Sequence, residues 1–503
     1  MKAIKNIVAG LATVLALSSC GGDFLDTDYK RYLGQDEVGA IAADDPTAFL
    51  NGIWSWMVNY DPLDFGPEEG IDDTWGYMSI LHVADLNSSD MLMSNIHWFN
   101  YDYQMDNRMS PWRRPLSHWT ILYGMVDRAN TLISLYPNGP QTASEKVVAG
   151  QAKAVRGLAY LMLIQLFQNP VNADGRIAED RAGVPIIYTE ADGKTAEEMD
   201  EAKGRNTVKD VLAFIEKDLT DAVEYLTDAD YARPSKNNID ANVANGLLAR
   251  YYLLTQQWDK AASAANTARQ GYKPMSLDAL HDGFLDIKNA EWMWGFEHNA
   301  ETTTLYASFF SHVSNLESGY AGLGFAPRCI DAMLYSQIPD DDERKTLFNG
   351  PDGDESQPTA AAQLPYANLK FGSDGELTED YVYMRAAEMY LIEAEALVRQ
   401  GDKAKAATVL GELMANRQPS WEKKSVTLND ILLQRRIELW GEGFAFFDLK
   451  RTNRGFVRNY EGTNHVAGAY TFDLEPQDPA WTYQIPDAEI QENTHISNKD
   501  QND

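Results

Sequence analysis

The clearest hydrophobic pattern in the chain covers Tyr383–Arg417, where apolar positions repeat at helical spacing. Tyr390, Ala394 and Leu397 are four and three residues apart, so they share one face of a helix. A Gln-Gly-Asp turn at residues 400–402 interrupts the pattern, and small and large apolar positions then return at the same spacing. The stretch therefore predicts two short antiparallel helices, the first beginning near Tyr383 and ending at this turn.

A second copy of the pattern lies upstream, over Asn245–Ala268. Leu248, Ala249 and Tyr252 occupy the first helix, and Gln256–Trp258 form the turn before an alanine-lined second helix. Both copies follow the spacing of a tetratricopeptide (TPR) unit. One such unit cannot bury its own apolar face, so further helices must pack beside it. Helical spacing predicts these helices at residues 45–59, 112–135, 151–167, 207–226 and 428–440, and a Thr207/Asp210 cap marks the start of the fourth.

Two regions lack sustained periodicity, residues 61–106 and 274–380. Both are dense in aromatic and acidic residues, and the second contains an alternating strand pattern at 291–297. Outside them, residues 183–188 indicate a short edge strand or an extended segment. Long aromatic loops on a helical scaffold are the usual place for binding. We therefore predict a mostly α fold, in which a TPR-like helix-turn-helix superhelix carries a less regular, ligand-binding half. Its helix pairs lie within about residues 112–270 and 380–450.

The N-terminus has the pattern of a targeting segment. Lys2 and Lys5 precede an apolar run too short to span a bilayer, and Leu17-Ser18-Ser19-Cys20 resembles a bacterial lipobox. We expect a signal peptide over residues 1–19, a diacylglycerol on Cys20, a tether over 20–40 and one domain over 41–503. An ordinary secretory signal is the alternative. No later apolar run is long enough to span a membrane, so the lipid would be the only anchor.

Composition further restricts the classes of partner and site that the chain can have. The 503-residue chain carries a formal charge of −32, which repels phosphate backbones and argues against nucleic-acid partners. A hydrophobic content of 44% supports a substantial core. With Cys20 lipidated, Cys329 has no partner in the chain, which argues against a disulfide or a cysteine metal site.

Short motifs recur in a specific order along nearly the whole mature chain. They are Phe24-Leu25-Asp26, Trp119-x3-Tyr123 with Ala129-Asn130, Gly183-Val184-Pro185, Leu247–Arg250, Arg385–Ala396, Arg435–Gly443 with Phe447–Arg451, and Ile485–Ile490. This order resembles the SusD/RagB family of Bacteroidetes outer-membrane nutrient-binding lipoproteins. The chain departs from the family pattern at Asp28 and Tyr29, where proline is frequent, and at Gln168, where glycine is.

The resemblance implies a fold and a set of partners. Four helix-turn-helix units would cradle the ligand-binding half, and the protein would sit as a lid on a SusC-like TonB-dependent outer-membrane transporter. Family members typically hold glycans on an arc of aromatic rings, whereas the RagB branch handles peptides. No cofactor or metal is implied.

Aromatic rings in the two aperiodic regions are the candidate binding residues. Trp and Tyr rings stack on the apolar faces of sugars, while polar side chains bond the hydroxyl edges. For any single ring, packing in the core is the alternative. The predicted ligand-binding rings are Trp75, Tyr77, Trp98, Tyr101, Tyr306, Phe309 and Tyr320.

Catalytic patterns are weak by comparison. Glu438 and Glu442 share a helical face, but Arg435 and Arg436 lie one turn away and favour structural ion pairs. The acidic stretch at 340–354 lacks the twelfth-position Glu of an EF-hand and is interpreted as a solvated loop.

We therefore predict a non-catalytic, surface-exposed lipoprotein that binds oligosaccharides or polysaccharides and passes them to the transporter. The alternatives are a RagB-type peptide receptor, a surface glycoside hydrolase, and a TPR scaffold with protein partners only.

Overall fold

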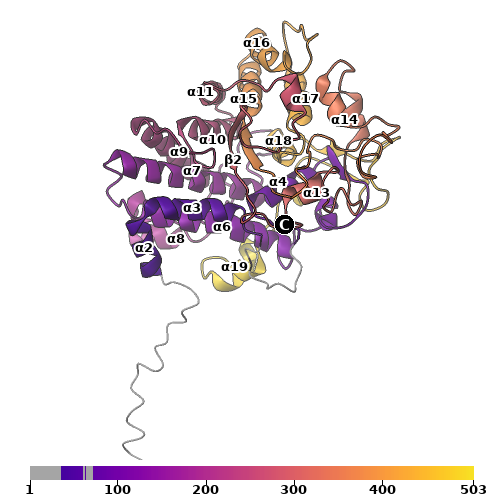
Figure 1. Ribbon diagram of the computed structural model, residues 1–503. Helices are drawn as coiled ribbons and strands as arrows, with labels where there is room; N and C mark the ends of the chain where they lie inside the picture. The colour runs from indigo at the N-terminus through magenta and orange to yellow at the C-terminus, as the bar shows by residue number, and fades with distance from the viewer. Residues whose placement is uncertain (1–34, 61–62, 64–71) are drawn as a thin grey trace, which may run out of the picture.

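The computed structural model describes residues 35–60, 63 and 72–503. Long helices lie in layers on one side of the molecule, and loops with short helices fill the other (Figure 1). The predicted signal peptide, Cys20 and Phe24–Asp26 lie outside the described residues. The mostly helical fold is confirmed.

A helical frame forms one half of the molecule. From α2 to α15 each of its helices packs against the next along the chain, and α15 also contacts α16 and α17 (Figure 1). This arrangement is the continuous stack that helical repeats require. The helices of the frame are α2 (Gln35–Asp44), α3 (Pro46–Met57), α6 (Arg113–Ile133), α7 (Ala143–Leu166), α9 (Val208–Asp228), α10 (Ala241–Leu254), α11 (Trp258–Ala268), α15 (Ala386–Arg399), α16 (Lys403–Met414) and α17 (Leu428–Glu438).

Local sequence explains where these helices begin and end. The Thr207 side chain accepts a hydrogen bond from the Asp210 backbone and caps α9, as predicted. Gly401 has φ +93°, a conformation that favours glycine, in the predicted turn between α15 and α16. Helix α7 starts eight residues earlier than predicted, because Thr142 and Glu145 form a capping box ahead of its apolar stretch.

The start of α15 differs from the prediction. Residues Tyr381–Arg385 form strand β4, which pairs antiparallel with β2 (Trp292–Phe296), the strand predicted at 291–297. All five residues of β4 are buried, so their apolar run merges with the helical pattern that follows. The extended segment at 183–188 is no strand; only Ala182 beside it makes an isolated bridge, to Thr207.

The loop half comprises described residues within 72–106 and 274–380. It contains α4 (Tyr77–Leu86), in which every residue is buried, including the polar Ser79, His82 and Asp85, so the helix has no solvent-exposed face. Strand β1 (Met91–Met93) pairs antiparallel with β3 (Arg328–Ile330). The short helices are α5 (Asn100–Tyr103), α12 (Leu277–Leu280), α13 (Phe309–Val313), α14 (Ala332–Ser336) and the 3-10 turn η3 (Glu343–Leu347).

The remaining elements lie between the frame helices or after them. Between α7 and α9 are η2 (Glu190–Asp192) and α8 (Ala196–Glu201). After α17 come α18 (Ala445–Arg451), β5 (Phe456–Val457), β6 (Asp473–Leu474), η4 (Pro479–Trp481), α19 (Asp487–Glu492) and η5 (Asn498–Asp500).

Helix α7 corrects one expectation about membranes. Contrary to the prediction that no later run is long enough, α7 has the length and apolar composition of a membrane-spanning helix. However, 94% of its most apolar window is buried against neighbouring elements. An all-round apolar helix of this kind belongs to the protein core.

Candidate functional site

The β1–β3 pair joins the two aperiodic regions of the sequence. Leu92 lies opposite Cys329 in this pair, and beyond it the Ser94 backbone donates to the Pro327 carbonyl at 2.9 Å. The Asn95 amide also donates to the Gly324 carbonyl, at 2.8 Å. The loops that continue from both strands, around residues 95–103 and 305–326, are therefore held side by side.

Five rings from these loops form one aromatic cluster: His97, Trp98, Tyr306, Tyr320 and Phe325. Tyr320 is at its centre, with ring centroids 5.3 Å from His97, 6.3 Å from Trp98, 5.9 Å from Tyr306 and 6.2 Å from Phe325. Tyr306 is 49% exposed and Phe325 is 51% exposed. The cluster therefore presents open ring faces, which suit stacking against the apolar face of a sugar.

Two residues, Asp72 and His312, fix the position of Tyr320. Its hydroxyl donates to the Asp72 carboxylate, and its ring stacks on buried His312 at 4.7 Å. Nε2 of His312 lies 2.6 Å from the Asp72 carbonyl oxygen, so this nitrogen carries the proton. Burial, and then the positive charge of Arg328, keep the pKa of His312 well below its usual value. The neutral His312 ring thus packs against the Tyr320 ring from the interior, and the exposed His97 ring stacks on Tyr320 at the surface.

The backbone at Phe99 turns neighbouring side chains in opposite directions. Phe99 has φ +69°, a left-handed conformation that costs a bulky residue roughly 1–2 kcal/mol. Its ring is 2% exposed and packs against Trp75 and His82, which offsets that cost. Trp98 before it is half-buried and Tyr101 after it is 58% exposed, so both remain at the surface.

A cleft of about 450 Å³ opens next to the aromatic cluster and shares His97 and Trp98 with it. Tyr101 lines this cleft together with Trp112, the residue before α6, which is 54% exposed. The cleft therefore offers two more open rings beside the cluster.

Three of the predicted ligand-binding rings are excluded by burial. Trp75 is 0%, Tyr77 1% and Phe309 1% exposed, so none of them has an open face. Trp75 is packed on several sides by the rings of Phe99, Phe309, His312 and Tyr381. Burial also raises the pKa of Tyr77 to about 12. These predictions were wrong because aromatic density alone does not distinguish a core ring from a surface ring.

The other four rings, Trp98, Tyr101, Tyr306 and Tyr320, lie at the surface of the loop half, and their role in binding stays a prediction. The prediction missed His97, Phe325 and Trp112. His97 and Phe325 stood in the aromatic-rich stretches without being selected, and Trp112 was assigned to the start of a helix.

Glu438 and Glu442 are not arranged as catalytic carboxylates. Glu438 is ion-paired with Arg385 at 2.7 Å and Arg417 at 2.8 Å, and Glu442 with Arg385 at 2.7 Å and Lys370 at 2.6 Å. Burial raises the pKa of Glu438, but Arg417 and the other cations outweigh it and hold that pKa well below its usual value. A permanently ionised, enclosed carboxylate cannot donate a proton to a glycosidic oxygen.

The structural interpretation of these two acids is therefore confirmed, but their predicted partners are wrong. Arg435 pairs with Asp448 at 2.7 Å and Arg436 with Asp90 at 2.6 Å. The actual partners come from strands and loops distant in sequence. The acidic stretch at 340–354 is also only partly solvated, because Asp342 is buried in an ion pair with Arg344.

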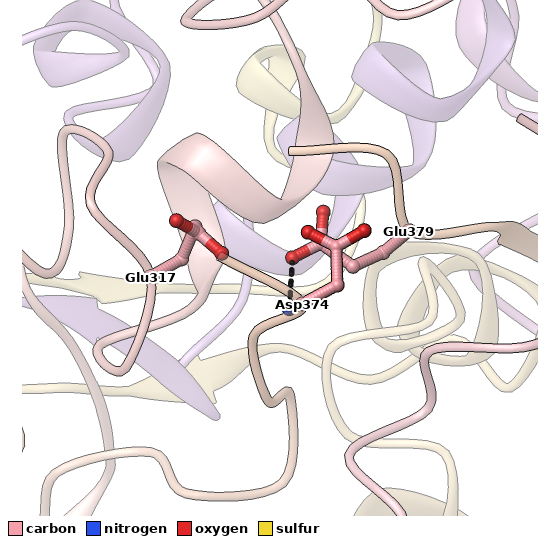
Figure 2. Close-up of side chains that lie close together, drawn as sticks. All are labelled: Glu317, Asp374 and Glu379. Carbon is pink, nitrogen blue, oxygen red and sulfur yellow. Dashed lines mark hydrogen bonds between the residues drawn. The ribbon is translucent and has the colours of Figure 1, made fainter. Parts of the chain in front are cut away.

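One group of carboxylates has the spacing of a cation site. Oxygens of Glu317, Asp374 and Glu379 lie within 4.8 Å of one another, and the three side chains converge in Figure 2. Glu317 accepts hydrogen bonds from backbone N–H groups, including that of Gly375 at 3.1 Å. Burial, with Glu317 beside it, raises the pKa of Glu379 to about 8. A proton on Glu379 therefore balances the buried pair at neutral pH, and the one ligand oxygen that each of the three side chains offers falls short of the roughly six to eight oxygens that Ca²⁺ takes.

Comparison with protein families gives two matches. The model described as "SusD family" matches residues 362–503, and the model described as "Starch-binding associating with outer membrane" matches residues 77–253. The first covers the end of the loop half, α15–α17 and the C-terminal segment. The second covers α4, much of the site and the helices from α6 to α10.

Individual relatives agree with these matches. A "SusD-like protein" from Bacteroides ovatus is 22% identical over 77% of this chain and 78% of its own. A solved "SusD-like carbohydrate binding protein" from Bacteroides vulgatus is 24% identical, with a TM-score of 0.76 over 92% of this chain and 98% of that chain. A "surface glycan-binding protein A" from Bacteroides uniformis is 17% identical, with a TM-score of 0.64 over 90% of this chain and 99% of that chain.

Proposed function

This chain belongs to the SusD/RagB family, and we propose that it binds oligosaccharides or polysaccharides at the cell surface without cleaving them. The observation that carries the proposal is the aromatic cluster, which presents open rings from two loops beside a cleft. Relatives described as carbohydrate-binding and glycan-binding proteins support it. The enclosure of Glu438 and Glu442 in ion pairs supports a binding role rather than glycosidic hydrolysis.

The proposal includes the route of the ligand. Lipidation at Cys20 would tether the protein to the outer membrane, and the bound glycan would pass to a SusC-like TonB-dependent transporter. The lipobox-like sequence and the family model's description, which names the outer membrane, support this location. Deletion of a neighbouring transporter gene should abolish glycan uptake while leaving cell-surface binding intact.

A panel of defined polysaccharides tests the binding function by calorimetry, with Trp98→Ala and Tyr101→Ala as variants. We expect at least one glycan to bind the wild type and each variant to lose about tenfold in affinity, the loss typical of a central aromatic contact. Met333→Ala, at an exposed site on α14 outside the cluster and the cleft, is the control and should bind as the wild type does. Binding of a peptide pool and of no glycan would instead favour a peptide receptor.

A further inference from the structure

The cleft beside the aromatic cluster is lined by aromatic rings together with charged and amide side chains. Two of its rings, Tyr101 and Trp112, are each more than half exposed. They come from separate segments, one from α5 and the other from the residue before α6. At about 450 Å³, the cleft falls within the range of roughly 300–1,000 Å³ that small-molecule sites occupy.

The charges that line this cleft are paired with one another. Arg114 is buried and binds Asp73 at 2.9 Å and Asp102 at 2.7 Å. Arg113 binds Asp73 at 2.7 Å. Two carboxylates and two guanidinium groups therefore cancel, and each cation already has an anionic partner. An acidic ligand would have to be desolvated without gaining an uncommitted positive charge, which is costly.

Two amides supply the hydrogen-bonding groups that a neutral sugar needs. Asn107 donates one N–H to Asp102 at 3.3 Å and keeps its carbonyl oxygen available. Asn100 also lines the cleft, and its side chain makes no hydrogen bond to other described residues. An amide both donates and accepts, which matches a hydroxyl group.

We propose that this cleft is a subsite for neutral sugar rings, continuous with the aromatic cluster, and that it excludes uronic-acid and sulfated glycans. Trp112 and Tyr101 stack on the ring faces, and Asn100 and Asn107 bond the hydroxyl groups. The chain's net charge of −32 acts in the same direction, because it repels polyanions before they reach the cleft. The inference rests on the proposed glycan-binding function and assigns it a class of ligand.

The test compares neutral with acidic probes by calorimetry on the full mature chain. The neutral probes are soluble β-glucan, α-glucan, xylan and mannan oligosaccharides, and the acidic probes are oligogalacturonates and chondroitin sulfate. We expect binding among the neutral probes and no measurable binding of the acidic ones. Tighter binding of an acidic probe than of every neutral one would overturn the assigned class.

Two variants separate the cleft from the cluster. Trp112→Ala should weaken neutral-oligosaccharide binding about tenfold or more, while Trp112→Phe, which keeps a ring, should retain most of it. Tyr306→Ala alters only the cluster and reports on the proposed function itself. If Trp112→Ala, folded with an unchanged melting temperature, binds as the wild type does while Tyr306→Ala is weakened, the cleft subsite is wrong and the glycan-binding function stands. If no glycan binds the wild type, both fail together.

Discussion

Helix α9 and the loop around Phe99 place their side chains in different ways. In α9 the buried residues, among them Val211, Ile215 and Leu219, follow helical spacing and form one face. In the loop, Phe99 is buried while Tyr101, two residues later, is 58% exposed. The comparison shows that the frame fixes burial through local geometry, whereas the loop half fixes it through contacts with distant segments.

The largest effect is expected where the two halves are joined by buried charges. Arg385 is the last residue of β4 and immediately precedes α15, and it pairs with Glu291, Glu438 and Glu442, each at 2.7 Å. Arg385→Ala should lower the free energy of unfolding by about 3–5 kcal/mol, because three buried carboxylates lose the cation that they share. Urea denaturation followed by circular dichroism measures this loss.

The matched control for that variant is Arg176→Ala, whose side chain is 82% exposed in its pair with Asp174. It should change stability by less than about 0.5 kcal/mol. Equal stabilities of the two variants would mean that the buried network does not hold the halves together.

An effect of comparable size should distinguish core rings from surface rings within the loop half. Trp75→Ala should cost about 3–5 kcal/mol, because it leaves a cavity among packed aromatic rings. Phe325→Ala, at a ring that is 51% exposed, should cost less than about 0.5 kcal/mol and instead weaken glycan binding. Thermal denaturation and calorimetry on both variants check the contrast; a Phe325 variant that loses stability and keeps its affinity would refute it.

The smallest effect is a pH dependence at the Glu317–Glu379 pair. The pKa of Glu379 is raised to about 8 from an ordinary value of 4.5, so the folded state holds a proton that the unfolded state releases. This contribution to stability is therefore complete below about pH 4.5 and is lost progressively as the pH rises through 8. Glu379→Gln removes the titrating group.

The unfolding free energies of wild type and Glu379→Gln should diverge between pH 5 and pH 9, in favour of the variant at high pH. Glu376→Gln, at an exposed carboxylate of the same loop that lies outside the group, is the control and should follow the wild-type curve. Parallel curves for wild type and Glu379→Gln would show that no proton is held there.

Much of the frame was predictable, because its signals are local. The spacing of Leu248, Ala249 and Tyr252 predicted α10, and the cap formed by Thr207 predicted the start of α9. The errors arose where burial is complete. Helix α4 has no exposed polar face, and β4 runs directly into α15. The hydrophobic pattern therefore does not show where either element begins and ends.

The sequence predicted which loops form the candidate site, but not which individual rings lie at its surface. Aromatic density indicated both loops correctly, but it could not assign Trp75 and Phe309 to the core or Phe325 and Trp112 to the surface. Those assignments depend on which segments pack over each ring, and the β1–β3 pair that sets this packing joins residues more than two hundred positions apart.

The sequence by itself determined the helical frame and the order of family motifs, since periodicity, caps and turns act over a few residues. It also determined the acidic charge, which is a property of composition alone. Tertiary structure decided which rings are open, which cations neutralise Glu438 and Glu442, and that the described carboxylates lining the cleft are paired with its arginines. The physical reason is that exposure and ion pairing depend on distances between segments remote in the chain, and only the folded packing sets those distances.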